Sequence, residues 1–433
     1  MSPGLIGGLG MAVLLVLIAM RVPIAIAMAA VGIVGGALIN GWTSLAFVLG
    51  SQPFATVFPY TLSVIPLFVM MGVFAAHAGL SRSLYQAIYS LIGHWRGGLA
   101  LATLGACAIF GAICGSSLAT AATMSRVAVP EMRRHGYDDR LSAGTLAAGG
   151  TLGILIPPSI IMVIFALLTE QSIGRMFLAG FLPGAVATIC YMIAAYLVAR
   201  LRPGAGPAGE RASWRERGVT LMGVGPVLLL FFVVMGGMYA GVFSPTEGAA
   251  VGSFGAFLLT LFTRRLTWRV FIDSLRETAS TTAMIFMIFI GTSILQYFIE
   301  TSTLPRLLND AIVASGMSRY MVLIVILAVY VILGCFLDSL SMLLITLPLF
   351  FPLVKSMGFD PIWFGILVVC VVEIGLITPP VGMNLFVIAA VVPGMPLKTV
   401  ISGVTPFIAA DLVRLAVLVA FPALSLWLPS LIK

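Results

Sequence analysis

Long apolar runs follow one another along almost the entire chain, and they constrain its fold more than any other feature of the sequence. Hydrophobic residues make up 61% of the chain and charged residues only 9%, whereas about 25% of the residues in an average soluble domain are charged. This composition predicts an all-α polytopic membrane protein, because lipid must be the solvent for most of the surface. The apolar segments are 4–20, 24–39, 61–78, 97–129, 141–168, 176–199, 219–240, 246–262, 278–299, 319–352, 361–392 and 403–428.

Four of these segments are interrupted in the middle by residues that break helices. Gly, Ser or Asp interrupts segments 97–129 and 319–352, and a Pro-Pro pair interrupts segments 141–168 and 361–392. We expect the first two to be re-entrant hairpins and the other two to be broken helices. Irregular backbone at membrane depth is tolerated only beside protein or a hydrated cavity, so these interruptions predict where a binding site lies.

The interruptions occur twice, in the same order and with the same spacing. At one constant shift, Ser117, Gly153 and Pro157 coincide with Ser339, Gly375 and Pro379. The chain is therefore predicted to consist of two repeats, 1–216 and 217–433, each with one hairpin and one broken helix. Five crossings in each half, an odd number, would place the second half upside down and give an inverted-topology repeat.

The basic residues indicate orientation rather than a nucleic-acid partner. The chain has a formal net charge of +8, and its arginines gather near the ends of apolar segments, above all in the linker 200–217. By the positive-inside rule this linker is cytoplasmic, and both termini are then periplasmic. Segments 42–57 and 265–277 precede a crossing in each half and are expected to be interfacial arms.

Oxygen-bearing residues gather at the interruptions. Hydroxyls and free carbonyls at Ser116, Ser117, Gly150 and Thr151 in the first half suit a hard cation such as Na⁺, and helix N-termini there suit an anion. A single Ser or Gly on a membrane helix is usually a packing contact, but two matched clusters favour a site. The second cluster comprises Asp338, Ser339, Gly375, Thr378 and Asn384.

Ionisable residues within the apolar segments are few. Asp338 and Glu373 would each cost about 2.5–3.5 kcal/mol at a helix centre, so both need a partner, and a bound cation is the expected one. Asp411 and Arg414 lie three residues apart on one helix face and are expected to neutralise each other.

The sequence contains no nucleotide-binding loop, metal-ligand cluster or nucleophile motif, so we expect a secondary transporter rather than an enzyme. A proton-translocating subunit of a respiratory enzyme would need a chain of intramembrane Lys, His and Glu residues, which this composition disfavours. A stand-alone Na⁺- or H⁺-coupled organic-anion symporter or antiporter of a related inverted-repeat fold remains an alternative.

Several motifs resemble those of one transporter family. The sequences GSSLATAATM (115–124), TLGILIPPSII (151–161) and EIGLITPPVGMNLF (373–386) are similar to the large membrane subunit of tripartite ATP-independent periplasmic (TRAP) transporters, the DctM-like family. The resemblance extends over essentially the whole chain. It implies an elevator-type fold like that of the ion transporter superfamily, located in the bacterial inner membrane and driven by Na⁺.

The resemblance also implies partners and site residues. The partners are a small four-helix (DctQ-like) membrane subunit and a periplasmic (DctP-like) protein that delivers a small organic anion. Many relatives carry an Arg where this chain has Gln52, so recognition of a substrate carboxylate would rest on hydroxyls and helix N-termini. By position, one Na⁺ site would comprise Ser116, Ser117, Gly150 and Thr151, and the other would comprise Asp338, Ser339, Gly375 and Thr378. The substrate would lie near Ser117, Ser159, Asn384 and Gln52.

Overall fold

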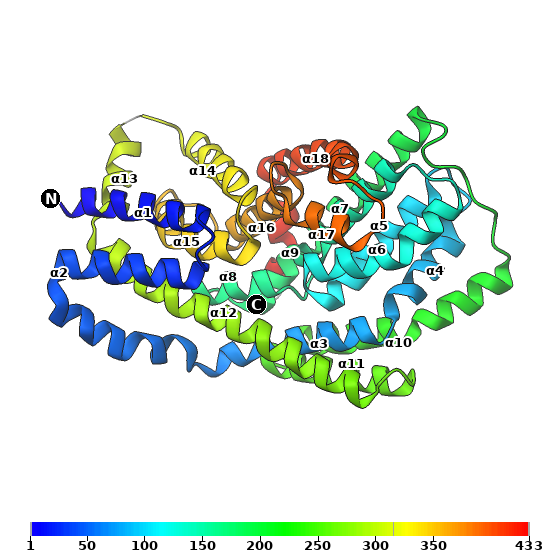
Figure 1. Ribbon diagram of the computed structural model, residues 1–433, viewed down its shortest axis with the longest axis horizontal. Helices are drawn as coiled ribbons and strands as arrows, with labels where there is room; N and C mark the ends of the chain where they lie inside the picture. Colours follow the sequence, from blue (N-terminus) through cyan, green and yellow to red (C-terminus); the bar gives the residue numbers. More distant parts are fainter. Residues whose placement is uncertain (1, 315, 432–433) are drawn as a thin grey trace. The chain divides into compact units, whose positions relative to one another are not determined.

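The computed structural model describes residues 2–314 and 316–431, and all the regular structure in these ranges is helical (Figure 1). Seven helices are long and apolar enough to cross a membrane, or eight if α7 and α8 are counted as one bent span. A polytopic helical membrane protein is therefore confirmed. The elements are α1 (Pro3–Ala19), α2 (Ile24–Val57), η1 (Tyr60–Ser63), α3 (Val64–His77), α4 (Leu80–Ile92), α5 (Gly98–Cys114), α6 (Ser117–Arg134), α7 (Asp139–Leu155), α8 (Ile160–Leu168), α9 (Ile173–Leu201), α10 (Trp214–Tyr239), α11 (Pro245–Phe262), α12 (Trp268–Thr301), α13 (Leu304–Ala314), α14 (Arg319–Gly334), α15 (Ser339–Ser356), α16 (Pro361–Ile377), α17 (Met383–Val391), α18 (Leu397–Ala420) and α19 (Ala423–Ser430).

The number of long spans is smaller than the ten crossings that the sequence predicts. Helix α1, the expected first crossing, has 17 residues, about 26 Å at 1.5 Å per residue, compared with a hydrocarbon core of about 30 Å. The broken helix expected over 361–392 is divided into α16, with 17 residues, and α17, with 9. Segment 403–428 is not one helix either. It breaks between α18 and α19 at Phe421 and Pro422, because proline cannot donate the next helical hydrogen bond.

Two amphipathic helices, α4 and α13, do not belong to any apolar run and were not predicted. On α4 the buried positions Leu80, Leu84 and Ala87 recur at helical spacing, while Arg82 and Gln86 are exposed. A helical period would have revealed this helix, whereas a search for uninterrupted apolar runs could not.

The chain forms two compact units. Unit 1 comprises residues 1–63, 279–330 and 339–361, and unit 2 comprises residues 64–278, 331–338 and 362–433. Both units draw on both halves of the sequence.

In unit 1, α2 packs closely against α12. A Cβ at Gly32 would lie 2.8 Å from the backbone of Ile294 and Leu295, and Asn40 donates a hydrogen bond to Tyr297. Gly41, with a φ of +76°, bends α2 and separates residues 42–57, which are expected to form the first arm, from the first part of this helix. The second predicted arm is not a separate element, because α12 runs without a break from Trp268 to Thr301.

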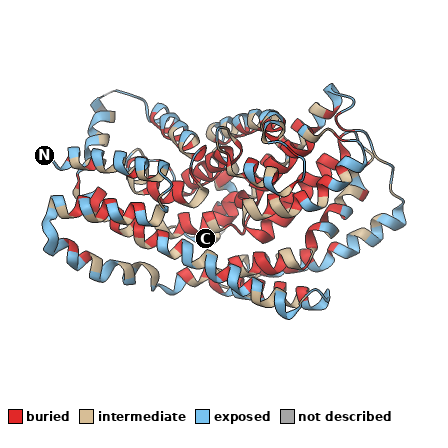
Figure 2. Cartoon of the chain, viewed as in Figure 1, coloured by how far each residue is buried: buried red, intermediate tan, exposed pale blue. Residues whose placement is uncertain are grey.

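Unit 2 contains the most deeply buried helices of the chain. Nearly every residue of α5, α7 and α16 is buried (Figure 2), as expected for helices that are apolar all round. Small residues allow close packing: a Cβ at Gly144 would lie 2.5 Å from the carbonyl carbon of Gly403 on α18.

The Arg-rich linker between α9 and α10 is fixed to unit 2. Tyr137 donates a hydrogen bond to the carbonyl of Pro207 at 2.9 Å and accepts one from the amide of Leu99 at 3.1 Å. Burial raises the pKa of Tyr137 to about 12, so this hydroxyl keeps its proton at physiological pH.

Candidate functional site

All four predicted interruptions are breaks in the helices. The breaks separate α5 from α6, α7 from α8, α14 from α15 and α16 from α17, and α8 is bent by 41° relative to α7. Serine residues cap two of the restarting helices. Ser116 Oγ accepts from the amide of Ala119 at 3.4 Å, and Ser159 Oγ accepts from the amide of Met162 at 3.5 Å. Ser is a favoured N-cap because its hydroxyl satisfies an amide that has no partner in the helix.

The first hairpin tip lies directly against the first broken helix. A Cβ at Gly111 would lie 2.6 Å from the Cα of Gly153, so the backbones of α5 and α7 approach as closely as glycine permits. A Cβ at Gly153 would in turn lie 2.9 Å from Thr120 Oγ1 and 3.2 Å from the carbonyl oxygen of Ser116. Side-chain and carbonyl oxygens from the tip thus face the Gly-rich end of α7.

The second hairpin tip contacts the second broken helix in a similar way. A Cβ at Gly375 would lie 2.5 Å from the Cα of Gly334, and the amide of Gly382 donates to the carbonyl of Cys335 at 3.3 Å. Asp338 is half-buried at the end of this tip and belongs to unit 2, while Ser339 begins α15 in unit 1.

Asn384 connects the second broken helix to the first half of the chain. Its Nδ2 donates to Ser117 Oγ at 2.8 Å and to the carbonyl of Ala147 at 3.1 Å, and Ser117 Oγ lies 3.1 Å from Asn384 Oδ1. A Cβ at Gly150 would lie 3.1 Å from Asn384 Nδ2 and 3.2 Å from the carbonyl oxygen of Ser117. Three of the predicted site residues, 117, 150 and 384, therefore meet inside unit 2.

The structure places other predicted residues elsewhere. Ser159 Oγ donates a hydrogen bond to the carbonyl of Ile154 at 2.5 Å, within the break between α7 and α8. Thr378 Oγ1 donates a hydrogen bond to the carbonyl of Ile374. Gln52 is exposed on α2 in unit 1. The hydroxyl of Thr151 does not join Ser117 and Gly150, because it contacts Tyr191 OH at 3.2 Å in a separate network.

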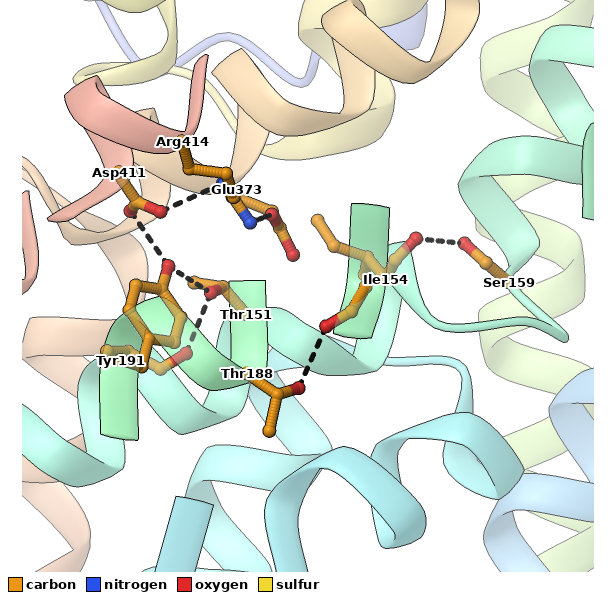
Figure 3. A network of polar contacts seen from close by, with 10 residues as sticks. Thr151, Ile154, Ser159, Thr188, Tyr191, Glu373, Asp411 and Arg414 are labelled. Atoms are coloured by element: carbon orange, nitrogen blue, oxygen red, sulfur yellow. Dashed lines mark hydrogen bonds and ion pairs between the residues drawn. The ribbon is translucent and has the colours of Figure 1, made fainter. Parts of the chain in front are cut away.

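This network is a buried cluster of charged residues (Figure 3). Arg414 Nη1 lies 2.6 Å from Glu373 Oε2, and Arg414 Nη2 lies 2.9 Å from Asp411 Oδ1. Tyr191 OH donates to Asp411 Oδ2 at 2.8 Å, which connects the ion pairs to Thr151. The side chains of all three charged residues are completely buried.

The cluster confirms one expectation about buried charge and corrects another. Asp411 and Arg414 pair as predicted, but the prediction that a bound cation compensates Glu373 is wrong, because Arg414 is its partner. Tyr191 was not predicted at all. It lies 220 positions from Asp411, and no local sequence signal links the two.

Broken helices and hairpin tips that meet inside a helical membrane protein are characteristic of membrane transporters, which bind their cargo at such irregular backbone. The sequence identifies the family. Residues 11–424 match the family described as the "Tripartite ATP-independent periplasmic transporter, DctM component", and the chain belongs to this family. It is thus a TRAP large permease subunit, a multi-pass membrane transporter component rather than an enzyme.

Individual relatives agree with this family. The chain is 39% identical over 383 residues to the C4-dicarboxylate TRAP transporter large permease protein DctM of Pseudomonas aeruginosa, covering 88% of this chain and 89% of that protein. It is 32% identical over 382 residues to the isethionate TRAP transporter permease protein DctMQ of Oleidesulfovibrio alaskensis, covering 86% and 59%. The solved structure of the Alcanivorax borkumensis YdaH transporter is similar in fold, with a TM-score of 0.65, 14% identity and coverage of 92% and 96%.

Proposed function

We propose that this chain carries a small organic anion into the cell across the bacterial inner membrane, driven by a Na⁺ gradient. A periplasmic binding protein delivers the anion, and a small four-helix membrane subunit works beside the chain. The observation that carries this proposal is the meeting of Ser117, Gly150 and Asn384, which brings a hairpin tip and both broken helices together.

Two relatives and the helix ends support the proposed substrate class. C4-dicarboxylate and isethionate, named for the two relatives, are both small anions. In this chain Gln52 offers no positive charge, and we propose that backbone amides supply the attraction instead. Helix α17 suits this role because Gly382, which precedes it, has no side chain to cap its amides. Unpaired amides at a helix N-terminus attract anions.

The first Na⁺ site is proposed at the first hairpin tip. The carbonyl oxygens of Ser116 and Ser117 face Gly153 and Gly150, and Thr120 Oγ1 is buried beside Gly153. Carbonyl and hydroxyl oxygens are the hard ligands that alkali cations prefer. Thr120 is thus a better hydroxyl ligand for this site than Thr151, whose hydroxyl is engaged with Tyr191.

The second Na⁺ site is proposed around Asp338, Gly375 and Thr378, which all belong to unit 2. Its support is the close contact of the second tip with the second break, which places a carboxylate near the irregular end of α16. We propose that the hairpins and broken helices move across the membrane in an elevator cycle, with the remaining long helices as the scaffold. The inverted repeat and the periplasmic position of both termini are part of the same proposal.

Uptake by proteoliposomes tests the function. The chain is reconstituted with its small subunit, the cognate binding protein is added outside, and uptake of radiolabelled substrate is followed under an inward Na⁺ gradient. We expect uptake to need both Na⁺ and the binding protein. Uptake that continues unchanged when K⁺ or choline replaces Na⁺ at constant membrane potential would refute the coupling, and uptake without the binding protein would favour a stand-alone symporter.

Asp338→Asn is expected to weaken Na⁺ activation while leaving assembly intact. Replacing a charged ligand by a neutral one costs about 1.5–3 kcal/mol, so half-maximal uptake should need about tenfold to a hundredfold more Na⁺. The measurement is uptake against Na⁺ concentration in proteoliposomes. The matched control is Asp310→Asn, at an exposed position on α13. Equal Na⁺ activation in the two variants would move the second site elsewhere.

A further inference from the structure

Helix α17, which restarts the second broken helix, is enclosed less completely than its counterpart at the first break. Three of its nine residues are buried, namely Asn384, Leu385 and Ile388. In α8, which restarts the first broken helix and also has nine residues, six are buried. Burial of apolar side chains therefore fixes α17 less firmly than α8, and polar contacts at the ends of α17 carry more of its placement.

Both ends of α17 are tied to the first half of the chain by hydrogen bonds. Near its start, Asn384 donates to Ser117 Oγ on α6 and to the carbonyl of Ala147 on α7. Beyond its end, the carbonyl of Pro393 accepts a hydrogen bond from Arg133 Nη1 at 2.9 Å. Ser117 is the first residue of α6, and Arg133 lies in its last turn. The two contacts therefore hold α17 to opposite ends of α6, all within unit 2.

The guanidinium of Arg133 is held in one orientation by Asp139, the first residue of α7. Arg133 Nε donates to Asp139 Oδ1 at 2.9 Å, and Arg133 Nη2 donates to Asp139 Oδ2 at 2.9 Å. Two parallel hydrogen bonds of this kind fix the plane of the guanidinium. The remaining nitrogen, Nη1, is thereby directed at Pro393, so one side chain joins α6, α7 and the turn that follows α17.

The acceptor of this hydrogen bond lies in a rigid turn. The amide of Met395 donates to the carbonyl of Val392 at 3.3 Å, and Gly394, at the third position of the turn, has a φ of +71°. Proline at the second position and a glycine of positive φ at the third are typical of a type II turn. The central carbonyl of such a turn, here that of Pro393, takes no part in the turn's own hydrogen bond and can accept one from Arg133.

We propose that Arg133 is a positioning residue for the site at the breaks. By joining Asp139 to the carbonyl of Pro393, it anchors the far end of α17 to α6 and α7. Because α17 is a short helix with few buried residues, this anchor also determines how firmly Asn384, at its near end, contacts Ser117. The anchoring of α17 is independent of the proposed function, whereas its effect on Na⁺ binding rests on it.

Hydrogen–deuterium exchange of the purified full-length protein, followed by mass spectrometry, tests the anchor directly. In Arg133→Gln the amides of α17 should exchange about threefold to tenfold faster, as expected for loss of the contacts of a partly exposed ion pair. Arg133→Lys should exchange as fast as Arg133→Gln, because a single ammonium keeps the charge but lacks the planar fork that reaches both partners. Arg134→Gln is the matched control, since it removes the same charge from the same exposed turn of α6.

Three results would overturn the anchoring role. The first is unchanged exchange of α17 in Arg133→Gln, or equal acceleration in Arg134→Gln. The second is an Arg133→Lys protein that exchanges like the wild type, which would show that charge alone suffices. The third is equal acceleration in α17 and in α10, which would indicate a general loss of stability rather than release of one helix.

Thermal unfolding in detergent at increasing NaCl, with choline chloride keeping the ionic strength constant, tests the effect on Na⁺ binding. Arg133→Gln should raise the Na⁺ concentration for half-maximal stabilisation about threefold to tenfold. In an Asn384→Ala background this effect should disappear, because Arg133 acts through Asn384. An equal effect in both backgrounds would overturn that route. If Na⁺ does not stabilise the wild type, the proposed coupling fails, while hydrogen exchange still decides whether Arg133 anchors α17.

Discussion

Arg414→Met is expected to lower the free energy of unfolding by about 3–5 kcal/mol, because it removes the cation shared by two completely buried carboxyls. Methionine fills most of the same volume, so the loss reflects the buried charge rather than a cavity. The measurement is thermal or denaturant unfolding of the protein purified in detergent, together with its yield as a monodisperse species. The expected phenotype is a sharp fall in both.

The matched controls separate charge from shape. Arg200→Met, at an exposed position in the last turn of α9, should change the stability by about 0.5 kcal/mol or less. The triple variant Glu373→Gln, Asp411→Asn, Arg414→Met removes the acids together with the base, and it should recover most of the loss. If Arg414→Met unfolds like the wild type, or if the triple variant is as unstable as the single one, the cluster does not stabilise the fold through its charges.

The breaks could be predicted from the sequence because their causes are local. A Pro-Pro pair cannot continue a helix, and Gly and Ser favour the ends of helices over their interiors. Each of the four interrupted segments accordingly breaks where its own residues require it. The same local reasoning failed for α4, whose apolar residues form a stripe rather than a run.

The partners across the fold could not be predicted in this way. Arg414 was assigned to Asp411, three residues away, because that pair can be found along one helix. Its shorter contact is with Glu373, 41 positions away on another helix, and only the packing of α16 against α18 brings those two together. The contact of Asn384 with Ser117, 267 positions apart, is of the same kind.

Thr151 shows how a correct segment can contain a misassigned residue. Consecutive residues on an α-helix point about 100° apart, so Thr151 faces a different neighbour from Gly150. Gly150 faces Ser117 and Asn384, while the Thr151 hydroxyl contacts Tyr191. A site predicted as a stretch of sequence therefore divides, in the structure, between a hairpin tip and a charged cluster.

This division has a functional consequence. Within one turn of α7, the backbone of Gly150 faces the proposed substrate and Na⁺ positions. The hydroxyl of Thr151 in the same turn faces the network of Arg414. The network also includes Glu373, just before the second break. A substitution that changes the charge of the cluster is therefore expected to affect both broken helices through α7 and α16.

Gly375→Ala is expected to reduce uptake at least tenfold, because the new methyl group would meet backbone rather than a movable side chain. Its Cβ would lie 2.5 Å from the Cα of Gly334 and 2.6 Å from its carbonyl carbon. The second hairpin tip must therefore separate from α16, at a cost of about 1–3 kcal/mol for overpacking. The measurements are substrate uptake and Na⁺ activation in proteoliposomes, with thermal unfolding in detergent to follow stability.

Gly236→Ala on α10 is the matched control for this substitution. No atom lies within 4 Å of a Cβ at that position, and alanine favours a helix over glycine by about 0.5–1 kcal/mol. It should therefore transport normally and unfold at the same temperature or a higher one. A Gly375→Ala protein that behaves like Gly236→Ala would show that the contact between the second tip and the second break is not needed for transport. A loss of uptake with little loss of stability would instead indicate that this contact holds the site in its working geometry.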